Sequence, residues 1–514
     1  MNGLNKQKQI IVAIDIGTTS AKCIAIHLSG RQLARSSVEY PLFTPQPDRA
    51  EQDPEQIWQA VVTGVQELFE KHGADPKQVL CFSFSSAMHA LIAMSTEGKP
   101  LTPSIIWADS RSTAYVEKLR QQYDAHGIYR RTGTPIHPMS PLLKLMWMNE
   151  EQPELFQAAD KFIGIKEYVL YRLFGRFVMD YSLASATGLY NLEKRDWDEE
   201  ALRAAGITAD RLPELVPTTA VLTGADRTIT DKWGIAPYTP FIAGASDGVL
   251  ANLGIGAVEE GVLAVTIGTS GAVRSVVGRP ATDEQERLFC YVLTDDQFVI
   301  GGAVNNGGVL FRWVRDELAT LETSQARDKG VDPYTHLTGL AAEVPPGSDG
   351  LLVLPLFMGE RAPYWNADTR GVFFGLSLYH TKKHMIRAVL EGICFAIRSV
   401  TEALRDNSGP IKEIRASGGF AQSPFWCQLL ADILGVTLKV PESVEGSSYG
   451  AAVLALQALG MNEHIPALLG QNLIEQTYEP NTEHKPIYDR LAALYQSLYE
   501  QLEGSFKVIV GLQK

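Results

Sequence analysis

Cysteine is scarce in this sequence, and its spacing excludes two classes of protein. Five cysteines occur in 514 residues, and no two of them form a C-x-x-C pair: they are Cys23, Cys81, Cys290, Cys394 and Cys427. Scattered thiols of this kind are typical of buried side chains in a reducing compartment. We therefore expect neither a disulfide framework nor a cysteine zinc site.

Long apolar runs and a basic surface are also missing. No stretch approaches the roughly 18 uninterrupted apolar residues of a membrane-spanning helix. Asp15 interrupts the apolar run near the N-terminus, and no small-residue cleavage site follows it. The formal net charge is −13, which provides no broad positive face for a nucleic acid. We predict a cytoplasmic protein that binds neither membranes nor nucleic acids.

The composition is otherwise that of a globular protein with more than one domain. Hydrophobic residues make up 45% of the chain and charged residues 20%, which are ordinary globular values. A chain of 514 residues is too long for a single core. Glycines cluster between Gly254 and Gly261. The sequence therefore predicts an N-terminal domain at 9–256 and a C-terminal domain at 257–514.

Strand and helix patterns alternate along both halves. Apolar runs predict strands at 10–14, 22–28 and 31–40, and Asp53-Pro54-Glu55 predicts the start of a helix. The second half repeats this order, with strands at 262–267 and 272–277, a long helix at about 383–404, a strand at 411–416 and a helix from Ser423 to near Gly435. This order predicts an α/β fold in which helices cover the sheets.

One short motif occurs twice, half a chain apart. A predicted strand runs into Gly17-Thr18-Thr19-Ser20 in the first half and into Gly268-Thr269-Ser270 in the second. Such turns can bring backbone N–H groups and small hydroxyls against phosphate oxygens. Only the first copy carries an acid, Asp15, where a phosphate-bound metal ion would sit. A single copy is usually an ordinary tight turn, but the repeat favours two similar lobes closing on a nucleotide.

Asp247 is the candidate general base. It lies between glycines directly after the apolar run 240–243. A carboxylate at the end of a strand can accept the proton of a substrate hydroxyl. From the pentapeptide alone, a turn residue or a helix N-cap is the more common role of such an aspartate, and its position between the two phosphate turns adds weight to the base.

Two glycine-rich segments are candidates for the nucleotide site. The segment 417–423 reads as a strand, a glycine turn and a helix start, and its paired glycines would let a base or ribose pack on the backbone. A simple connection between strand and helix explains it equally well. The segment 301–308 holds four glycines and two asparagines, which suits a wall against phosphate or ribose.

A third group of residues suits a polyol. Met88-His89 and the segment Trp107-Ala108-Asp109-Ser110-Arg111 each follow a predicted strand. Asp and Arg can hydrogen-bond several hydroxyls, and Trp offers an apolar face to C–H groups. Each of these residues taken alone is more often structural.

Two longer patterns carry a family resemblance. Met139-x-Pro141-x-x-Lys144-Leu145-x-Trp147 is similar to the first signature of the FGGY carbohydrate kinases, and Gly371-x-Phe373-x-Gly375-Leu376 begins a match to the second. The resemblance implies two actin-like, ribonuclease-H-type lobes with a nucleotide cleft between them. It also implies ATP and Mg²⁺ as cosubstrates and phosphorylation of a sugar or polyol hydroxyl. A homodimer is plausible on the same ground.

The resemblance also assigns residue roles. Asp247 matches the catalytic base and Asp15 the acid near the metal ion. The cofactor-binding residues predicted are Thr18, Thr19, Ser20, Lys22, Gly268, Thr269, Gly308, Arg312, Gly418, Gly419 and Ser423. The substrate-binding residues predicted are Met88, His89, Trp107, Asp109, Arg111 and Asp247. The Arg-Glu pair that holds glycerol in glycerol kinases is absent, which argues against glycerol.

Within the family, several stretches resemble bacterial gluconate kinases: 83–89, 131–138, 163–168, 180–186 and 304–308. This implies D-gluconate as the acceptor and 6-phosphogluconate as the product. The carboxylate of such a sugar acid needs a cation, for which the candidates are His89, Arg111, His137, Lys144, Lys166 and Arg361, with His89 and Arg111 preferred. The alternatives are a ketopentose kinase for xylulose or ribulose and a non-catalytic actin-like ATP-binding regulator.

Overall fold

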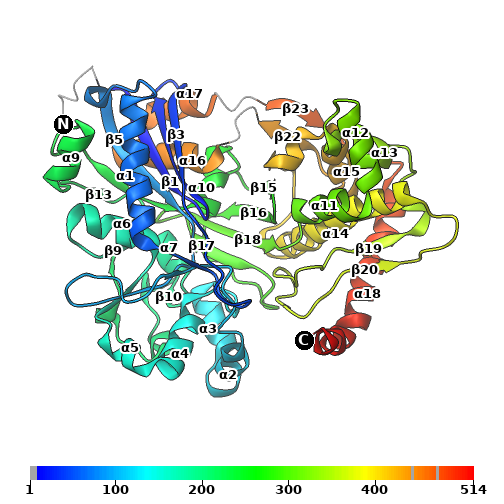
Figure 1. Ribbon diagram of the computed structural model, residues 1–514, viewed down its shortest axis with the longest axis horizontal. Coiled ribbons are helices and arrows are strands. Elements are labelled where there is room, and N and C mark those ends of the chain that lie inside the picture. The colour runs from blue at the N-terminus through cyan, green and yellow to red at the C-terminus, as the bar shows by residue number, and fades with distance from the viewer. Residues whose placement is uncertain (1–7, 442–444, 471–473, 514) are drawn as a thin grey trace. The chain divides into compact units, whose positions relative to one another are not determined.

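The structure is a computed structural model that describes residues 8–441, 445–470 and 474–513 (Figure 1). The chain divides into two compact units, each made of three segments. The first unit is 1–256, 277–299 and 445–473, and the second is 257–276, 300–444 and 474–514. Two segments, 277–299 and 445–473, therefore group with the first unit although they follow residue 256.

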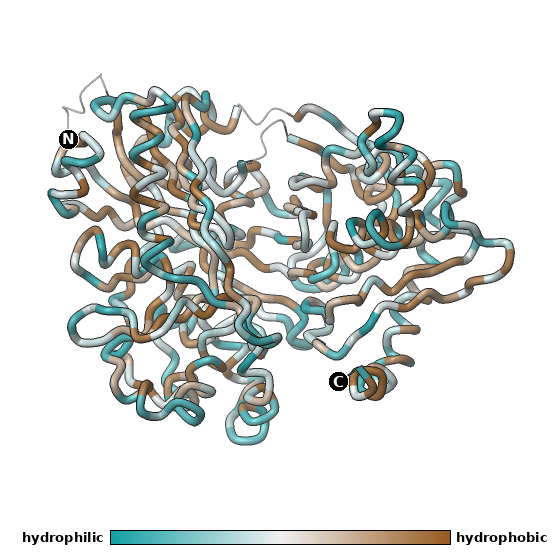
Figure 2. Tube along the Cα trace, in the orientation of Figure 1, coloured by the Kyte–Doolittle hydropathy of each residue, from teal (hydrophilic) through white to brown (hydrophobic). Residues whose placement is uncertain are grey.

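The sheet of the first unit is built on an antiparallel hairpin. Its strands are β1 (Ile10–Ile16) and β2 (Ser20–His27), and β3 (Gln32–Glu39) pairs with β2. On the other side, β5 (Val79–Ser86) runs parallel to β1, β14 (Phe241–Ser246) runs parallel to β5, and β13 (Val221–Leu222) forms the edge. Every residue of β1 is buried, and the central strands are among the most hydrophobic parts of the trace (Figure 2).

Helices cover this sheet as the sequence predicts. In α1 (Pro54–Glu70), the Asp53 side chain accepts the N–H groups of Glu55 and Gln56, and Pro54 occupies the first turn. The positions expected to face the sheet are buried: Ile57, Val61, Val65 and Leu68. Two further helices, α10 (Asp247–Gly254) and α16 (Gly446–Ala458), pack closely on each other, and α16 also packs on β1, β5 and β14.

The second unit repeats this strand order. The hairpin of β15 (Val262–Ile267) and β16 (Gly271–Val277) lies at its centre, with β18 (Phe298–Val304) beside β16. On the other side of β15 lie the parallel strands β21 (Glu413–Ser417) and β22 (Leu438–Pro441), followed by β23 (Ile474–Tyr478). The repeated α/β arrangement agrees with the predicted fold class.

Long helices complete the second unit. They are α14 (Lys382–Ser408), α15 (Pro424–Leu434) and α18 (Lys485–Leu512), which pack on one another. The predicted boundaries of α15 are confirmed, because Ser423 caps its start and Gly435, with a φ of +64°, ends it. Shorter helices are α11 (Gly308–Trp313), α12 (Thr320–Asp328) and α13 (Pro333–Ala342).

The first unit contains further helices that pack on its sheet, on α16 or around a second hydrophobic core. These other helices of the first unit are α2 (Ala114–Gln122), α3 (Ala125–Thr132), α4 (Pro141–Glu151), α5 (Pro153–Ala158), α6 (Ile165–Phe174), α7 (Tyr181–Ser185), α8 (Glu199–Ala205), α9 (Arg227–Trp233) and α17 (Ile465–Gly470). Its short strands include β7 (Ser104–Ile105), β9 (Val178–Asp180) and β17 (Phe289–Val292). Among the helices that the structure describes, we find none with the length and apolarity needed to cross a bilayer.

Candidate active site

Asp15 lies near the carboxyl end of β1, where two hydroxyl groups hold its carboxylate. Ser85 of β5, its partner in the sheet register, donates to Oδ1 at 2.7 Å. Ser447 at the start of α16 donates to Oδ2 at 3.2 Å. Burial raises the pKa of Asp15 above its usual value, although both hydroxyls and Lys22 favour the charged form. The carboxylate is thus fixed in place and would be stabilised by a nearby cation.

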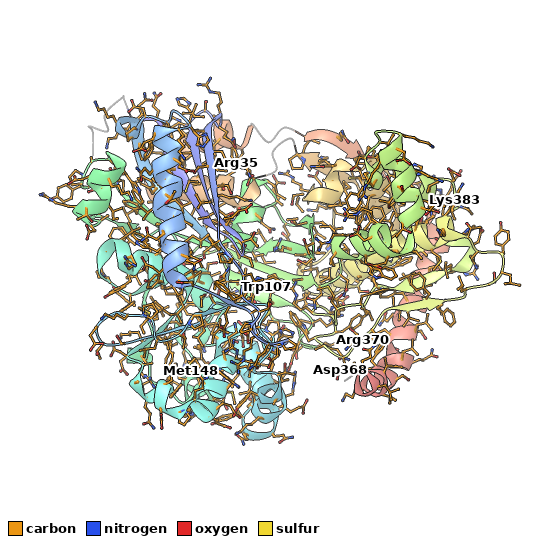
Figure 3. The ribbon with its side chains drawn as sticks, viewed as in Figure 1. Arg35, Trp107, Met148, Asp368, Arg370 and Lys383 are labelled. Carbon is orange, nitrogen blue, oxygen red and sulfur yellow. The ribbon has the colours of Figure 1, made fainter. Side chains whose placement is uncertain are left out.

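The first predicted phosphate turn connects β1 to β2. The Gly17 N–H donates to the Ser20 carbonyl at 3.0 Å, and the indole N–H of Trp107 donates to the Thr18 hydroxyl at 3.1 Å. Thr19 is exposed at the tip. Lys22, further along β2, lies 3.7 Å from Glu445, which also pairs with Arg35 (labelled in Figure 3). The turn is therefore rigid at its base and open at its tip.

Asp247 lies at the same edge of the sheet as Asp15. It follows directly on β14, whose Ser246 is in register with Ser86 of β5. Asp247 opens α10, and its Oδ1 accepts the N–H of Gly248 at 2.6 Å. In α/β folds, ligands bind beyond the carboxyl ends of parallel strands. The cap interpretation of Asp247 is wrong by one residue, because Ser246 is the N-cap of α10 and Asp247 is its first helical residue. Half-buried Asp247 lies at such a strand end, which is compatible with a catalytic role.

His89 lies in a strained backbone turn that a buried lysine supports. Its φ is +68°, which non-glycine residues rarely adopt, and its Nδ1–H donates to the Ala186 carbonyl at 2.7 Å. The Nζ of Lys144 donates to the carbonyls of His89, Ile106 and Ile105 at 2.7, 2.8 and 3.2 Å. Lys144 is 0% exposed, and burial lowers its pKa to about 7. It therefore fixes the loops that carry Met88-His89 and Trp107.

Asp109 and Arg111 bind each other. Arg111 donates through Nε to Asp109 Oδ1 at 2.8 Å and through Nη2 to Asp109 Oδ2 at 2.7 Å, and it also pairs with Glu51. Its guanidinium lies 5.1 Å from the ring centre of Trp147. Two carboxylates thus already neutralise Arg111. In this geometry Arg111 braces the loop after Trp107, and it is not poised to hold a substrate carboxylate.

Three other cationic candidates are likewise engaged. Lys166 forms a buried ion pair with Asp180. In the second unit, Arg361 donates through Nε to Asn305 Oδ1 at 2.7 Å. Lys144 binds the three carbonyls described above. His89 binds the Ala186 carbonyl, and His137 Nδ1 accepts the Met139 N–H at 3.2 Å, so every cationic candidate considered from the sequence has a protein partner.

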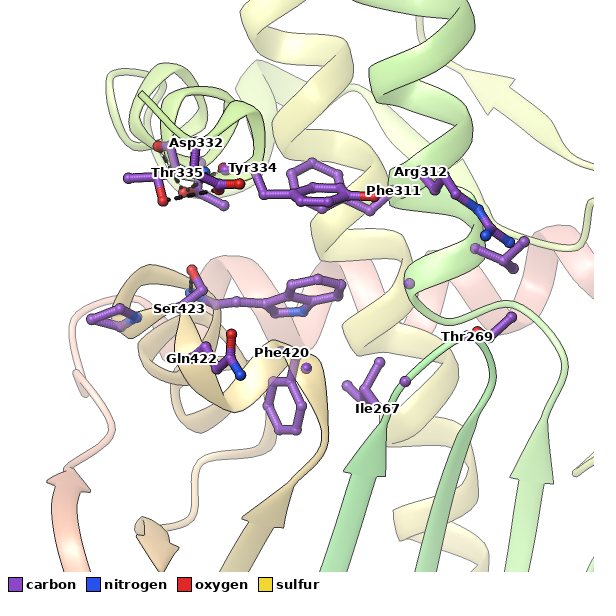
Figure 4. A pocket seen from close by; sticks show the side chains of 17 residues that line it. Ile267, Thr269, Phe311, Arg312, Asp332, Tyr334, Thr335, Phe420, Gln422 and Ser423 are labelled. Atoms are coloured by element: carbon purple, nitrogen blue, oxygen red, sulfur yellow. Dashed lines mark hydrogen bonds between the residues drawn. The ribbon is translucent and has the colours of Figure 1, made fainter. Parts of the chain in front are cut away.

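The second unit contains a cavity of about 540 Å³ (Figure 4). Six of the predicted cofactor-binding residues line it: Gly268, Thr269, Gly308, Arg312, Gly419 and Ser423. Gly418 lies next to them without lining it. Its φ is +92°, and a Cβ there would lie 2.6 Å from the Ile267 carbonyl oxygen, so the close approach to β15 requires glycine.

Aromatic rings form one wall of this cavity. Phe311 lies 5.4 Å from Tyr334 and 5.5 Å from Trp426, and Phe420 lies 6.0 Å from Trp426, measured between ring centres. At the other end, the Gly268 N–H donates to the Ser270 carbonyl at 2.9 Å, closing a turn like that of the first unit. A cavity with several aromatic side chains in its lining and a glycine-hydroxyl turn beside them suits a planar base with attached phosphates.

The asparagines of segment 301–308 do not line this cavity, although the sequence predicts a wall against phosphate or ribose there. Asn306 is buried, and its side chain donates to the Gly359 carbonyl at 2.9 Å and accepts the Met358 N–H at 3.1 Å. Glu360 accepts the N–H groups of Asn305 and Arg361. The amides therefore fix the loop before α11, and only Gly308 of the predicted wall reaches the cavity.

Both halves of the chain match one family. The N-terminal domain of the FGGY family of carbohydrate kinases matches residues 10–254, and its C-terminal domain matches 263–459. The chain belongs to the FGGY family of carbohydrate kinases. It is 48% identical over 511 residues to a gluconokinase of Bacillus subtilis (strain 168), covering 98% of both chains.

Solved FGGY kinase structures share this fold. A gluconate kinase and a ligand-bound xylulose kinase, both from Lactobacillus acidophilus, each match with a TM-score of 0.92 and 36% identity. Each match covers 97% of this chain and 99% of the other. The two-lobe FGGY fold predicted from the signatures is confirmed.

Several residues that form these sites could not be predicted from the sequence. Ser447 follows Asp15 by 432 residues, so no local pattern connects the two. Glu360 has no motif around it that predicts binding to the segment 305–306. The aromatic wall also combines residues from three separated segments. Alternation of strands and glycine turns predicts where sites form, but the partners of buried polar groups depend on the tertiary fold.

Proposed function

We propose that this protein transfers the γ-phosphoryl group of ATP to the terminal hydroxyl of D-gluconate, forming 6-phospho-D-gluconate and ADP. The main support is the position of Asp247 at the carboxyl end of β14, in a chain 48% identical along its whole length to a gluconokinase. A ketopentose kinase is the second candidate, because a xylulose kinase structure matches equally well in fold.

In this proposal, the first unit binds the sugar acid. Met88, His89 and Trp107 contact the acceptor, while Asp109 and Arg111 hold their loop. Asp247 accepts the proton of the acceptor hydroxyl as its oxygen bonds to the γ-phosphorus, and the bond from that phosphorus to the bridging oxygen of ADP breaks. The Gly248 N–H, which donates to Asp247 at 2.6 Å, keeps the carboxylate oriented before transfer.

The second unit binds the nucleotide. Its cavity takes the base against Phe311, Tyr334 and Trp426, and the turn at Gly268-Thr269 contacts phosphate oxygens. In the first unit, Thr18, Thr19, Ser20 and Lys22 supply the other phosphate contacts. The hydroxyl-rich turn and the exposed tip at Thr19 support this assignment.

Asp15 fits a Mg²⁺ ion carried by the nucleotide. Its carboxylate is an oxygen ligand fixed by Ser85 and Ser447. Among the residues that the structure describes, we find no group of three His, Cys, Asp or Glu side chains that could hold a metal ion. Mg²⁺ often takes one or two carboxylates together with substrate phosphates and water. When bound, the ion would neutralise phosphate charge.

The test combines one variant with a panel of acceptors. Asp247→Asn should keep the wild-type unfolding temperature and lose about 10²- to 10⁴-fold in kcat, because the base is gone. Asp53→Asn, which keeps a good helix cap, is the matched control and should retain kcat. The measurement is ADP release with D-gluconate, D-xylulose, L-ribulose or no acceptor.

Each outcome has a distinct meaning. Near wild-type kcat in Asp247→Asn would remove the base assignment. Turnover on xylulose or ribulose but not gluconate would replace the acceptor and keep the mechanism. Nucleotide binding without turnover on any acceptor would favour the regulator.

A further inference from the structure

A buried polar network lies behind the strand that carries Asp247. Lys166 of α6 and Asp180 at the end of β9 form an ion pair in which both side chains are 0% exposed. The same Lys166 Nζ donates to the Ala243 carbonyl of β14 at 2.8 Å. This ion pair therefore anchors β14 four residues before Asp247.

The network continues from Asp180 to the residue next to Asp247. Asp180 Oδ1 accepts the N–H groups of Ser182 and Leu183 at 2.9 and 3.1 Å, which caps α7. The Ser182 hydroxyl oxygen accepts the Ser246 N–H at 3.2 Å and lies 3.3 Å from the Ser246 hydroxyl. Lys166 and Ser182 thus hold β14 at two points, and the second immediately precedes Asp247.

The composition of this network is unusual for a purely stabilising core. Removing two charges from water is costly, and well-packed apolar side chains would often stabilise such a position as well or better. A buried pair does, however, fix hydrogen-bonded groups in one geometry. Here those groups are the backbone carbonyl of Ala243 and the cap of α7, both of which set the position of β14's end.

We propose that Lys166, Asp180 and Ser182 are positioning residues for Asp247. They do not touch the substrates; they orient the strand end so that the Asp247 carboxylate meets the acceptor hydroxyl. The proposal rests on the proposed role of Asp247 as the general base. It also explains why Lys166, although cationic, does not serve the substrate carboxylate.

The first experiment removes one hydroxyl. Ser182→Ala should lower kcat about 10- to 100-fold, as expected for a small misplacement of a reacting group, with the KM for gluconate and for ATP unchanged. The matched control is Ser36→Ala in the same unit, which removes a buried hydroxyl that donates to the Gly64 carbonyl at 2.6 Å. It should lower the unfolding temperature similarly and leave kcat unchanged. Equal kcat in the two variants would overturn the proposal.

The second experiment asks whether the effect acts through the base. In an Asp247→Asn background, Ser182→Ala should cause no further loss of kcat, because the group it positions is gone. A further loss of the same size would overturn the proposal.

The third experiment replaces the buried ion pair. Lys166→Met combined with Asp180→Leu, which avoids leaving a lone buried charge, should lower kcat in a folded protein.

The two proposals fail differently. If Asp247→Asn retains kcat, the base assignment fails whatever Ser182 does. If Asp247→Asn is inactive while Ser182→Ala and the double variant have wild-type kcat, only the positioning role fails.

Discussion

Burial changes the acid–base behaviour of single side chains, as Glu360 shows. Its side chain is 1% exposed, and its carboxylate accepts N–H groups from Asn305, Asn306 and Arg361 in front of α11. These donors favour the charged form, but burial outweighs them and raises the pKa of Glu360 to about 7. The Glu360 side chain thus binds the segment that precedes α11. It keeps its proton at pH values where a free glutamate would lose it.

This shift predicts a pH dependence of stability. Between the ordinary value of 4.5 and about 7, folded Glu360 retains a proton that the unfolded chain releases, so its contribution to stability falls as pH rises through this window. Glu360→Gln should remove a decline on the order of 3 kcal/mol. The measurement is the free energy of unfolding in urea from pH 4.5 to 8. Identical slopes for variant and wild type would contradict the assignment.

Two helices of the first unit approach each other more closely than side chains would allow. A Cβ on Gly254 of α10 would lie 1.8 Å from the Gly446 carbonyl oxygen, and a Cβ on Gly450 of α16 would lie 2.0 Å from that of Leu250. These glycines therefore weaken each helix alone and permit the contact between the two. The contact places the start of α16, with Ser447, beside Asp15.

Glycine-to-alanine substitutions inside and outside this contact should change the stability of the protein in opposite directions. Gly450→Ala should destabilise the protein by about 2 kcal/mol or more, because backbone must move to admit the methyl group. Gly504 lies in α18, where an added Cβ would have no neighbouring atom within 4 Å. Gly504→Ala should therefore stabilise the protein by about 0.5–1 kcal/mol. Thermal and urea unfolding measure both. A stabilised Gly450→Ala variant would show that the helices separate freely.

Elements were easier to predict from the sequence than contacts. The caps of α1 and α15 are local signals, and the structure contains both where the sequence places them. Arg111 shows the limit, because its partner Glu51 lies 60 residues away and is revealed only by the fold. The sequence does not show whether an arginine is exposed or already paired with carboxylates. The sequence alone therefore favoured a substrate role for Arg111.

The two units are proposed to bind different ligands, which predicts a separate footprint for each ligand. A non-hydrolysable ATP analogue alone should slow amide hydrogen exchange in α11 and at 419–423, since these residues line the cavity of the second unit. Gluconate alone should slow exchange around 86–89 and 246–250 of the first unit. Hydrogen-exchange mass spectrometry measures both footprints. Gluconate protection confined to the second unit would contradict the assignment.

The interleaving of chain segments between the two units has a consequence during synthesis. The sheet of the first unit is made by residue 246, but α16, which packs on three of its strands, spans Gly446–Ala458. About 200 residues must be translated in between, which takes roughly 10 to 40 s at ordinary ribosomal rates. During that interval the surface that α16 covers has no native partner. The nascent chain should therefore be a client for chaperones that bind exposed apolar strands.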